Sequence, residues 1–130
     1  MQYALLVHGS PYASRACHSA WEFAKAIVST QEHTLLGVFF YQDSVLIGNQ
    51  LAQVSRDEFN IQTAWQHLSK ESGVPLHLCI AAAISRGIIN ESESQRYELE
   101  ASTLAPQFQL EGLGSFVALI NDCDKLISFK

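Results

Sequence analysis

Residues 76–87 have the sequence LHLCIAAAISRG, and this stretch decides how the chain folds. The apolar run 76–80 is typical of a strand that is covered on both faces. The alanine-rich residues that follow, up to Gly87, favour the start of a helix. Cys79 therefore lies at the carboxyl end of a predicted strand. It faces the first free N–H groups of a predicted helix, which include those of Ala81 and Ala82.

The position of Cys79 suits a thiolate. The first N–H groups of a helix, together with its dipole, favour an anion. A helix N-terminus is also one of the settings that stabilise the reactive thiolate of cysteine. Since open α/β sheets place their binding crevice at the carboxyl ends of the strands, the sequence predicts that Cys79 is a sulfur nucleophile at the mouth of such a fold. The alternative interpretation is a small buried hydrophobic residue, which is the commoner role of a cysteine in a strand.

Three further side chains are candidates for a supporting role. Arg86, about two turns after Cys79, either steadies a sulfur anion or binds the carbonyl groups that end the short helix. His77 lies two residues before Cys79, hence on the same face of the strand, where it acts as a base or packs in the core. Tyr41 ends another apolar run, 35–41, and either lines the crevice or belongs to the sheet core. The sequence leaves each pair of interpretations open.

Apolar residues elsewhere in the chain alternate between strand-like runs and helical spacing. This pattern predicts a three-layer α/β/α sandwich with a mainly parallel, flavodoxin-like central sheet of about five strands. The length of 130 residues predicts a single domain, 1–130. The predicted strands cover 1–7, 35–41, 76–80, 108–110 and 126–129. The predicted helices cover 14–28, 61–73, 81–87, 91–100 and 112–120, and residues 42–60 form a loop of undetermined structure.

The composition indicates a subunit with protein partners. Charged residues make up 16% of the chain, against about 25% in an average soluble domain, while 48% are hydrophobic. A domain of this size hides that much apolar surface more easily in an assembly. The net charge of -5 and the absence of a basic run argue against direct binding to nucleic acid, which needs clustered lysine and arginine.

The cysteine pattern and the N-terminus together predict a cytoplasmic protein. The three cysteines are odd in number and widely spaced, which fits neither a disulfide framework nor a zinc site. Cys17 falls on the apolar stripe of its helix, and Cys123 lies between two aspartates, so both are predicted to be structural. The first apolar run stops at His8 without a basic leader, and no stretch approaches the ~20 apolar residues of a membrane span. The turn at 9–12 lacks the glycine pattern of a phosphate loop, so we expect no cofactor and no metal.

Taken together, the segments of this chain resemble the DsrE/TusD family. The most specific part is CIAAA at 79–83, followed by Arg86-Gly87-Ile88 and Glu91. The resemblance covers nearly all 130 residues without large gaps. Other matching segments are VFFY at 38–41, NQL at 49–51, DEF at 57–59, AW at 64–65, GLG at 112–114 and CD at 123–124.

The resemblance implies a sulfurtransferase subunit of a sulfur relay. In TusD-like members the cysteine that matches Cys79 accepts sulfane sulfur, as a persulfide, from a TusA-like donor. It passes the sulfur to a TusE-like acceptor for 2-thiolation of the wobble uridine of certain tRNAs. Such subunits work with TusB- and TusC-like chains in a heterohexamer, a dimer of heterotrimers. No cofactor and no direct contact with nucleic acid are implied.

Three alternatives remain at this level. The first is a DsrE-like subunit that carries sulfur in dissimilatory sulfur oxidation. The second is a non-catalytic assembly subunit of the same fold, in which Cys79 only packs. The third is a flavodoxin-like module that binds a nucleotide or flavin, against which the missing phosphate loop counts.

Overall fold

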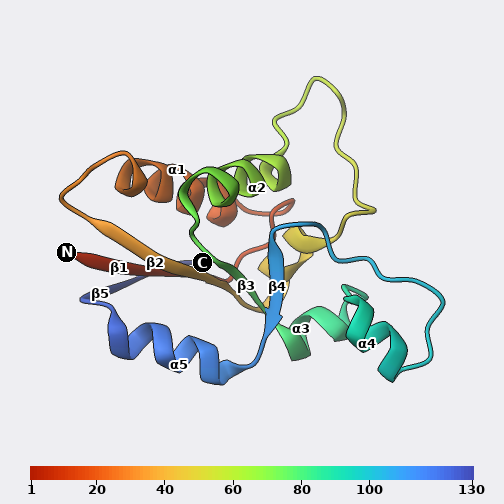
Figure 1. Ribbon diagram of the computed structural model, residues 1–130. Coiled ribbons are helices and arrows are strands. Elements are labelled where there is room, and N and C mark those ends of the chain that lie inside the picture. Colours follow the sequence, from red (N-terminus) through yellow and green to blue (C-terminus); the bar gives the residue numbers. More distant parts are fainter.

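The computed structural model describes residues 1–130. Its centre is a five-stranded sheet (Figure 1), and every neighbouring pair of strands in this sheet is parallel. The strand order is β4-β3-β2-β1-β5. The predicted parallel α/β sandwich of about five strands is therefore confirmed, although this order differs from that of flavodoxin. The strands are β1 (Gln2–Val7), β2 (Thr34–Phe40), β3 (Leu76–Cys79), β4 (Phe108–Glu111) and β5 (Lys125–Phe129).

Helices cover both faces of the sheet, but unequally. Figure 1 shows α1 and α2 on one face, α5 on the other, and α3 and α4 beyond the end of β3. None of these helices is both long and apolar enough to cross a membrane. Their bounds are α1 (Ala16–Val28), α2 (Ile61–Ser72), α3 (Ile80–Ser85), α4 (Glu91–Arg96) and α5 (Leu113–Asp122).

The alternation of side chains along β2 explains its continuous apolar sequence. Phe40 points to the α2 face, where its ring lies 5.4 Å from that of Trp65. Phe39 points to the opposite face, where its ring lies 5.0 Å from that of Phe116 on α5. Because neighbouring side chains of a strand alternate between the two faces, a strand covered on both sides needs apolar residues at every position.

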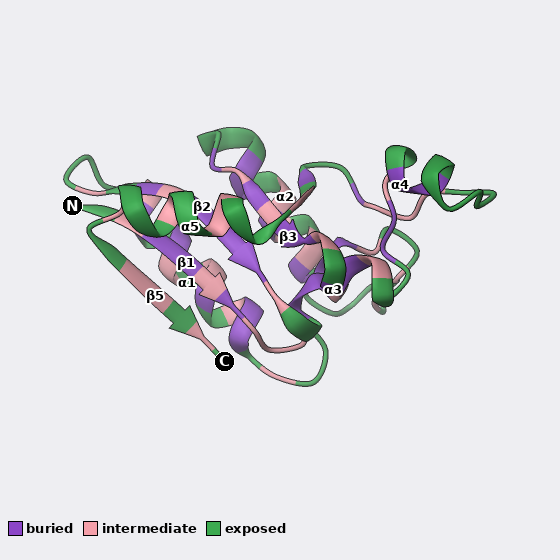
Figure 2. Ribbon diagram, turned by 90° about the horizontal axis from the view of Figure 1, so that it is seen from below, coloured by how far each residue is buried: buried purple, intermediate pink, exposed green.

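The two helical layers differ in how much of their surface they bury. The inner sides of α1 and α2 contribute fully buried residues such as Ala20 and Trp65. In contrast, α5 has no buried residue, and Leu113, Val117 and Ile120 are 54%, 52% and 41% exposed. Figure 2, seen from the side of α5, shows this helix only in the colours of intermediate and exposed residues. Three of the exposed large apolar side chains are therefore gathered on α5.

Two segments differ most from the sequence-based expectation. The segment 42–60 begins with a 3-10 helix, η1 (Gln42–Gly48), whose Val45 and Ile47 are fully buried. Helix α4 is capped by Asn90, whose side chain accepts a hydrogen bond from the Glu93 N–H at 2.8 Å. It ends at Arg96 and not near residue 100, because Glu98 adopts a left-handed φ of 55° that closes the helix.

Candidate active site

Cys79 lies where the sequence predicts, at the junction of a strand and a helix. It is the last residue of β3 and the N-cap residue of α3, which begins one residue earlier than expected, at Ile80. No side chain makes a capping hydrogen bond at this helix start. The first N–H groups of a helix lack partners within the helix. The N–H groups of Ala81 and Ala82 therefore lie near Cys79 without a capping side chain.

A pocket of about 540 Å³ opens beside Cys79. Cys79 itself is only 4% exposed, so its thiol lies recessed in the wall of this pocket. Three parts of the chain form the pocket: the turn after β2, the helix α3 and the start of α5. The lining residues are Tyr41, Gln42, Cys79, Ile80, Ala81, Ala82, Ser85, Arg86, Gly112 and Leu113.

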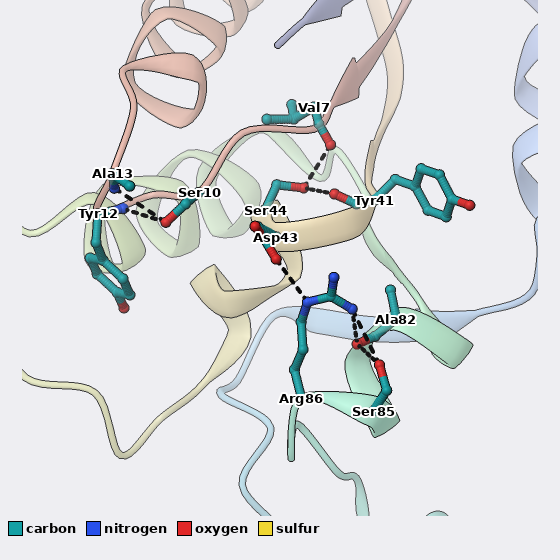
Figure 3. A network of polar contacts seen from close by, with 10 residues as sticks. All are labelled: Val7, Ser10, Tyr12, Ala13, Tyr41, Asp43, Ser44, Ala82, Ser85 and Arg86. Atoms are coloured by element: carbon teal, nitrogen blue, oxygen red, sulfur yellow. Dashed lines mark hydrogen bonds and ion pairs between the residues drawn. The ribbon is translucent and has the colours of Figure 1, made fainter.

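Arg86 is held by three hydrogen bonds at the edge of this pocket (Figure 3). Its Nε donates to the Asp43 carboxylate at 3.0 Å. Its Nη1 donates to the Ala82 carbonyl at 3.0 Å and to the Ser85 hydroxyl at 3.2 Å. The two interpretations of Arg86 are therefore compatible, since the same side chain binds a helix carbonyl and lines the pocket.

Five of the six candidate residues come together in the pocket, and His77 does not. The pocket contains Tyr41, Cys79, Ala81, Ala82 and Arg86. His77 is half-buried, and its Nδ1 is buried without a hydrogen-bond partner. Burial lowers the pKa of His77, against a smaller opposing effect of the Glu111 carboxylate. The imidazole is therefore neutral near pH 7, and it stands outside the pocket.

Asp43 is a polar residue near the pocket that the sequence-based reasoning missed, as it missed Gln42, which lines the pocket. Asp43 lies in η1, a segment without a clear periodicity, and it contacts the pocket only through Arg86. One signal in the sequence does point to it. Asp43 follows closely after the carboxyl end of a buried strand, β2, and parallel strands place the crevice at that end.

The other two cysteines have different surroundings. Cys17 is fully buried, and burial raises its pKa to about 12. Its thiol donates to the Gly9 carbonyl at 3.5 Å, so the prediction that Cys17 belongs to the core is confirmed. Cys123 is the C-cap residue of α5 and is partly exposed. No group of three or more His, Cys, Asp or Glu side chains is arranged to hold a metal ion.

Comparison with known proteins places these features in a family. Residues 1–129 match the model of the DsrE/DsrF-like family. Sulfurtransferase TusD of Klebsiella pneumoniae (strain 342) is 43% identical over 129 residues, which cover 99% of this chain and 100% of that protein. Sulfurtransferase TusD of Yersinia pestis (strain Pestoides F) is 40% identical, with 99% and 98% covered. The crystal structure of the YchN protein from E. coli has the same fold, with a TM-score of 0.77, 21% identity, and 99% and 100% of the two chains covered.

Proposed function

The chain belongs to the DsrE/DsrF-like family and, like its TusD relatives, is a sulfurtransferase; from this premise we propose that Cys79 is the residue that carries the sulfur. One observation carries the proposal. Of the three cysteines, Cys79 alone lines the pocket at the carboxyl end of β3. Cys17 has no such opening and stays protonated near pH 7, because its pKa is raised to about 12. Cys123 lies at the far end of α5 from Leu113, the residue of that helix that lines the pocket.

The proposed reaction is a sulfur exchange in two steps. In the first, the Cys79 thiolate attacks the outer sulfur of a donor persulfide, R–S–SH. A new S–S bond forms at Cys79, the S–S bond of the donor breaks, and the donor leaves as a thiolate that takes up the proton lost by Cys79. In the second step an acceptor thiolate attacks the outer sulfur of the Cys79 persulfide in the same way. No net oxidation occurs, so no redox partner is required.

We propose supporting roles for the residues around Cys79. The N–H groups of Ala81 and Ala82, at the start of α3, stabilise negative charge on the sulfur. Arg86 adds a fixed positive charge at the edge of the pocket. Tyr41 forms part of the pocket wall. His77 takes no part in the exchange, because it lies outside the pocket.

We propose further that the donor is TusA-like, the acceptor TusE-like, and the end product 2-thiolated wobble uridine in tRNA. The identity of 43% to a TusD protein over the full length supports this pathway. The net charge of -5 agrees with it, since a relay subunit hands on sulfur without binding tRNA itself. We place the chain in the cytoplasm, where its three free cysteines stay reduced.

The exposed side of α5 supports a role for TusB- and TusC-like partner subunits. Leu113, Val117 and Ile120 are each more than two-fifths exposed. Exposed apolar side chains gathered on one helix are typical of a protein interface. We therefore propose that a chain of the same fold covers α5 in a heterohexamer. Analytical ultracentrifugation with and without TusB- and TusC-like chains tests this, and a monomer that ignores both contradicts it.

A reconstituted relay tests the proposed pathway. The components are a TusA-like donor, the chain with its TusB- and TusC-like partners, a TusE-like acceptor and tRNA, and the measured product is 2-thiouridine. We expect full activity with the wild type and with Cys123→Ser, and none with Cys79→Ser. Sulfur uptake by the wild type without transfer to the TusE-like acceptor favours the sulfur-oxidation alternative.

The 4% exposure of Cys79 is the observation that favours the second candidate, an assembly subunit. A cysteine that only packs is as deeply buried as this one. The Cys79→Ser variant separates the two functions. Full formation of thiolated tRNA with this variant leaves the assembly role as the function of the chain.

A further inference from the structure

Resting on the proposed role of Cys79, we propose that Asp43 is a positioning residue for the same site. It holds Arg86 at the edge of the Cys79 pocket, so that this arginine recognises sulfur donors that carry negative charge. The proposal depends on the hydrogen bonds of the guanidinium group, on the anchoring of η1, and on the exposure of the ion pair.

The hydrogen bonds of Arg86 leave one end of its guanidinium group free. The group has five N–H donors, one on Nε and two on each Nη. The Nε donor is used by Asp43, and Nη1 serves the Ala82 carbonyl and the Ser85 hydroxyl. Nη2 has no partner, and Figure 3 shows this third nitrogen between η1 and α3. Two N–H donors are therefore available to an anionic group that enters the pocket.

Asp43 is able to fix Arg86 because η1 is itself firmly anchored. Ser44, the next residue, is fully buried. Its N–H donates to the His8 carbonyl at 3.1 Å, and its hydroxyl lies 2.6 Å from the Val7 carbonyl and 2.7 Å from the Tyr41 carbonyl. These contacts tie the turn to the carboxyl ends of β1 and β2. The carboxylate of Asp43 therefore starts from a rigid base.

The backbone on the other side of Asp43 is also unusual. Gln42 adopts a left-handed φ of 52°, a backbone conformation that residues other than glycine rarely take. This residue lines the pocket. Backbone strain of this kind persists where the surrounding structure requires it, and it is often found at functional sites. The sharp turn at Gln42 brings Asp43 towards α3, where it meets Arg86.

The ion pair is too exposed to serve mainly the stability of the fold. The side chains of Arg86 and Asp43 are 31% and 62% exposed. Pairs of this kind contribute little to the free energy of unfolding, because water competes for both charges. What the carboxylate does provide is a partner for Nε, which together with the two hydrogen bonds of Nη1 fixes the orientation of the whole guanidinium group.

The test compares sulfur uptake from two small persulfides, one that carries carboxylates and one that carries none. Glutathione persulfide carries two carboxylates, whereas cysteamine persulfide carries an ammonium group and no carboxylate. We expect Asp43→Asn to slow uptake from glutathione persulfide about threefold to tenfold, and to change uptake from cysteamine persulfide much less. Asp43→Glu keeps the carboxylate and should restore most of the rate. The matched control is Asp57→Asn, which removes the same charge from an exposed residue of the chain and should have no effect.

The sign of the effect distinguishes positioning from simple electrostatics. If Asp43 acted through its charge alone, its removal would make the pocket more positive, and the anionic donor would react faster. A faster or unchanged rate with Asp43→Asn therefore overturns the proposal. In an Arg86→Gln background the Asp43→Asn change should have no further effect, because its partner is already absent. Equal effects of Asp43→Asn in both backgrounds also overturn the proposal.

A second measurement separates this proposal from the proposed function. Alkylation of Cys79 by iodoacetate, which is anionic, and by iodoacetamide, which is neutral, needs no sulfur transfer. We expect Asp43→Asn to lower the ratio of the two rates at Cys79, measured by mass spectrometry of the peptide. If Cys79→Ser takes up sulfur normally, the proposed function fails while this ratio still tests Asp43. An unchanged or raised ratio contradicts the positioning role whatever the outcome for sulfur transfer.

Discussion

Cys17 and Cys79 are both buried in the same apolar core, yet their surroundings differ in one respect. Cys17 is 0% exposed and Cys79 is 4% exposed, so burial hardly distinguishes them. Cys17 lies within α1, against the Gly9 carbonyl. Cys79 lies at the end of a strand and opens to a pocket of about 540 Å³. The comparison teaches that access from a pocket, more than the exposed fraction, separates a candidate nucleophile from a packed thiol.

The largest expected difference between the two cysteines is in sulfur uptake. Cys79→Ser should abolish uptake from a persulfide donor, because a hydroxyl cannot carry sulfane sulfur, and it should leave the melting temperature nearly unchanged. Cys17→Ser should retain uptake in the folded fraction. It should lower the free energy of unfolding by roughly 1–3 kcal/mol, since a more polar hydroxyl on a shorter bond replaces the thiol in the core. Thermal unfolding and bound sulfane sulfur are measured for both variants. If both variants lose stability equally and both keep sulfur uptake, the proposed functional difference between Cys79 and Cys17 is contradicted.

The next largest difference should appear in alkylation of the wild type. Cys79 should react first with iodoacetamide, because it lines a pocket. Cys17 should react only after unfolding, since a pKa of about 12 leaves about one side chain in ten thousand ionised at pH 8. Peptide mapping with and without denaturant measures both rates. Rapid modification of Cys17 in the native protein would show that its helix opens more readily than its burial implies.

A further effect, confined to alkaline pH, should follow from the titration of Cys17. Its thiol ionises near pH 9 when unfolded and near pH 12 in the native core. Because the native state holds the proton more tightly, this contribution to stability is complete below about pH 9 and is lost as the pH rises towards 12. The wild type should therefore lose about 1.4 kcal/mol of unfolding free energy per pH unit more than Cys17→Ala in that range. Urea denaturation of both proteins under reducing conditions measures the difference, and parallel pH curves would refute it.

The smallest effect is expected at His77. This side chain belongs to the residue two positions before Cys79 on β3. It lies outside the pocket, and burial lowers its pKa and so keeps it neutral. His77→Gln should therefore change the rate of sulfur uptake by less than about twofold, because no proton transfer depends on it. A decrease of tenfold or more in the rate of sulfur uptake, with an unchanged melting temperature, would indicate that His77 acts as a base.

The site at Cys79 was accessible from the sequence because local patterns define it. The apolar run 76–80 followed by alanines signals a strand and a helix start within twelve residues, so both signals can be recognised without knowledge of distant contacts. Cys17 was equally clear, since it falls on the apolar stripe of α1. The same reasoning gave Tyr41 its place at the end of β2, where it lines the pocket.

The parts that escaped prediction depend on tertiary contacts. Residues 42–48 lack a helical or strand period, and η1 forms because Val45 and Ile47 are buried and Ser44 binds the ends of two strands. The contact between Asp43 and Arg86 spans 43 positions of sequence and has no local signature. The depth of Cys79 likewise depends on α5 and on the turn after β2, which the sequence does not place relative to each other.

Mapping the site of sulfur attachment in the wild type tests the central claim most directly. The protein is incubated with glutathione persulfide, digested, and its three cysteine-containing peptides are examined by mass spectrometry. We expect the gain of one sulfur atom on the peptide that contains Cys79, and none on the peptide that contains Cys17. Sulfur found on Cys17 or Cys123 with Cys79 unmodified would contradict the assignment of Cys79 as the sulfur carrier.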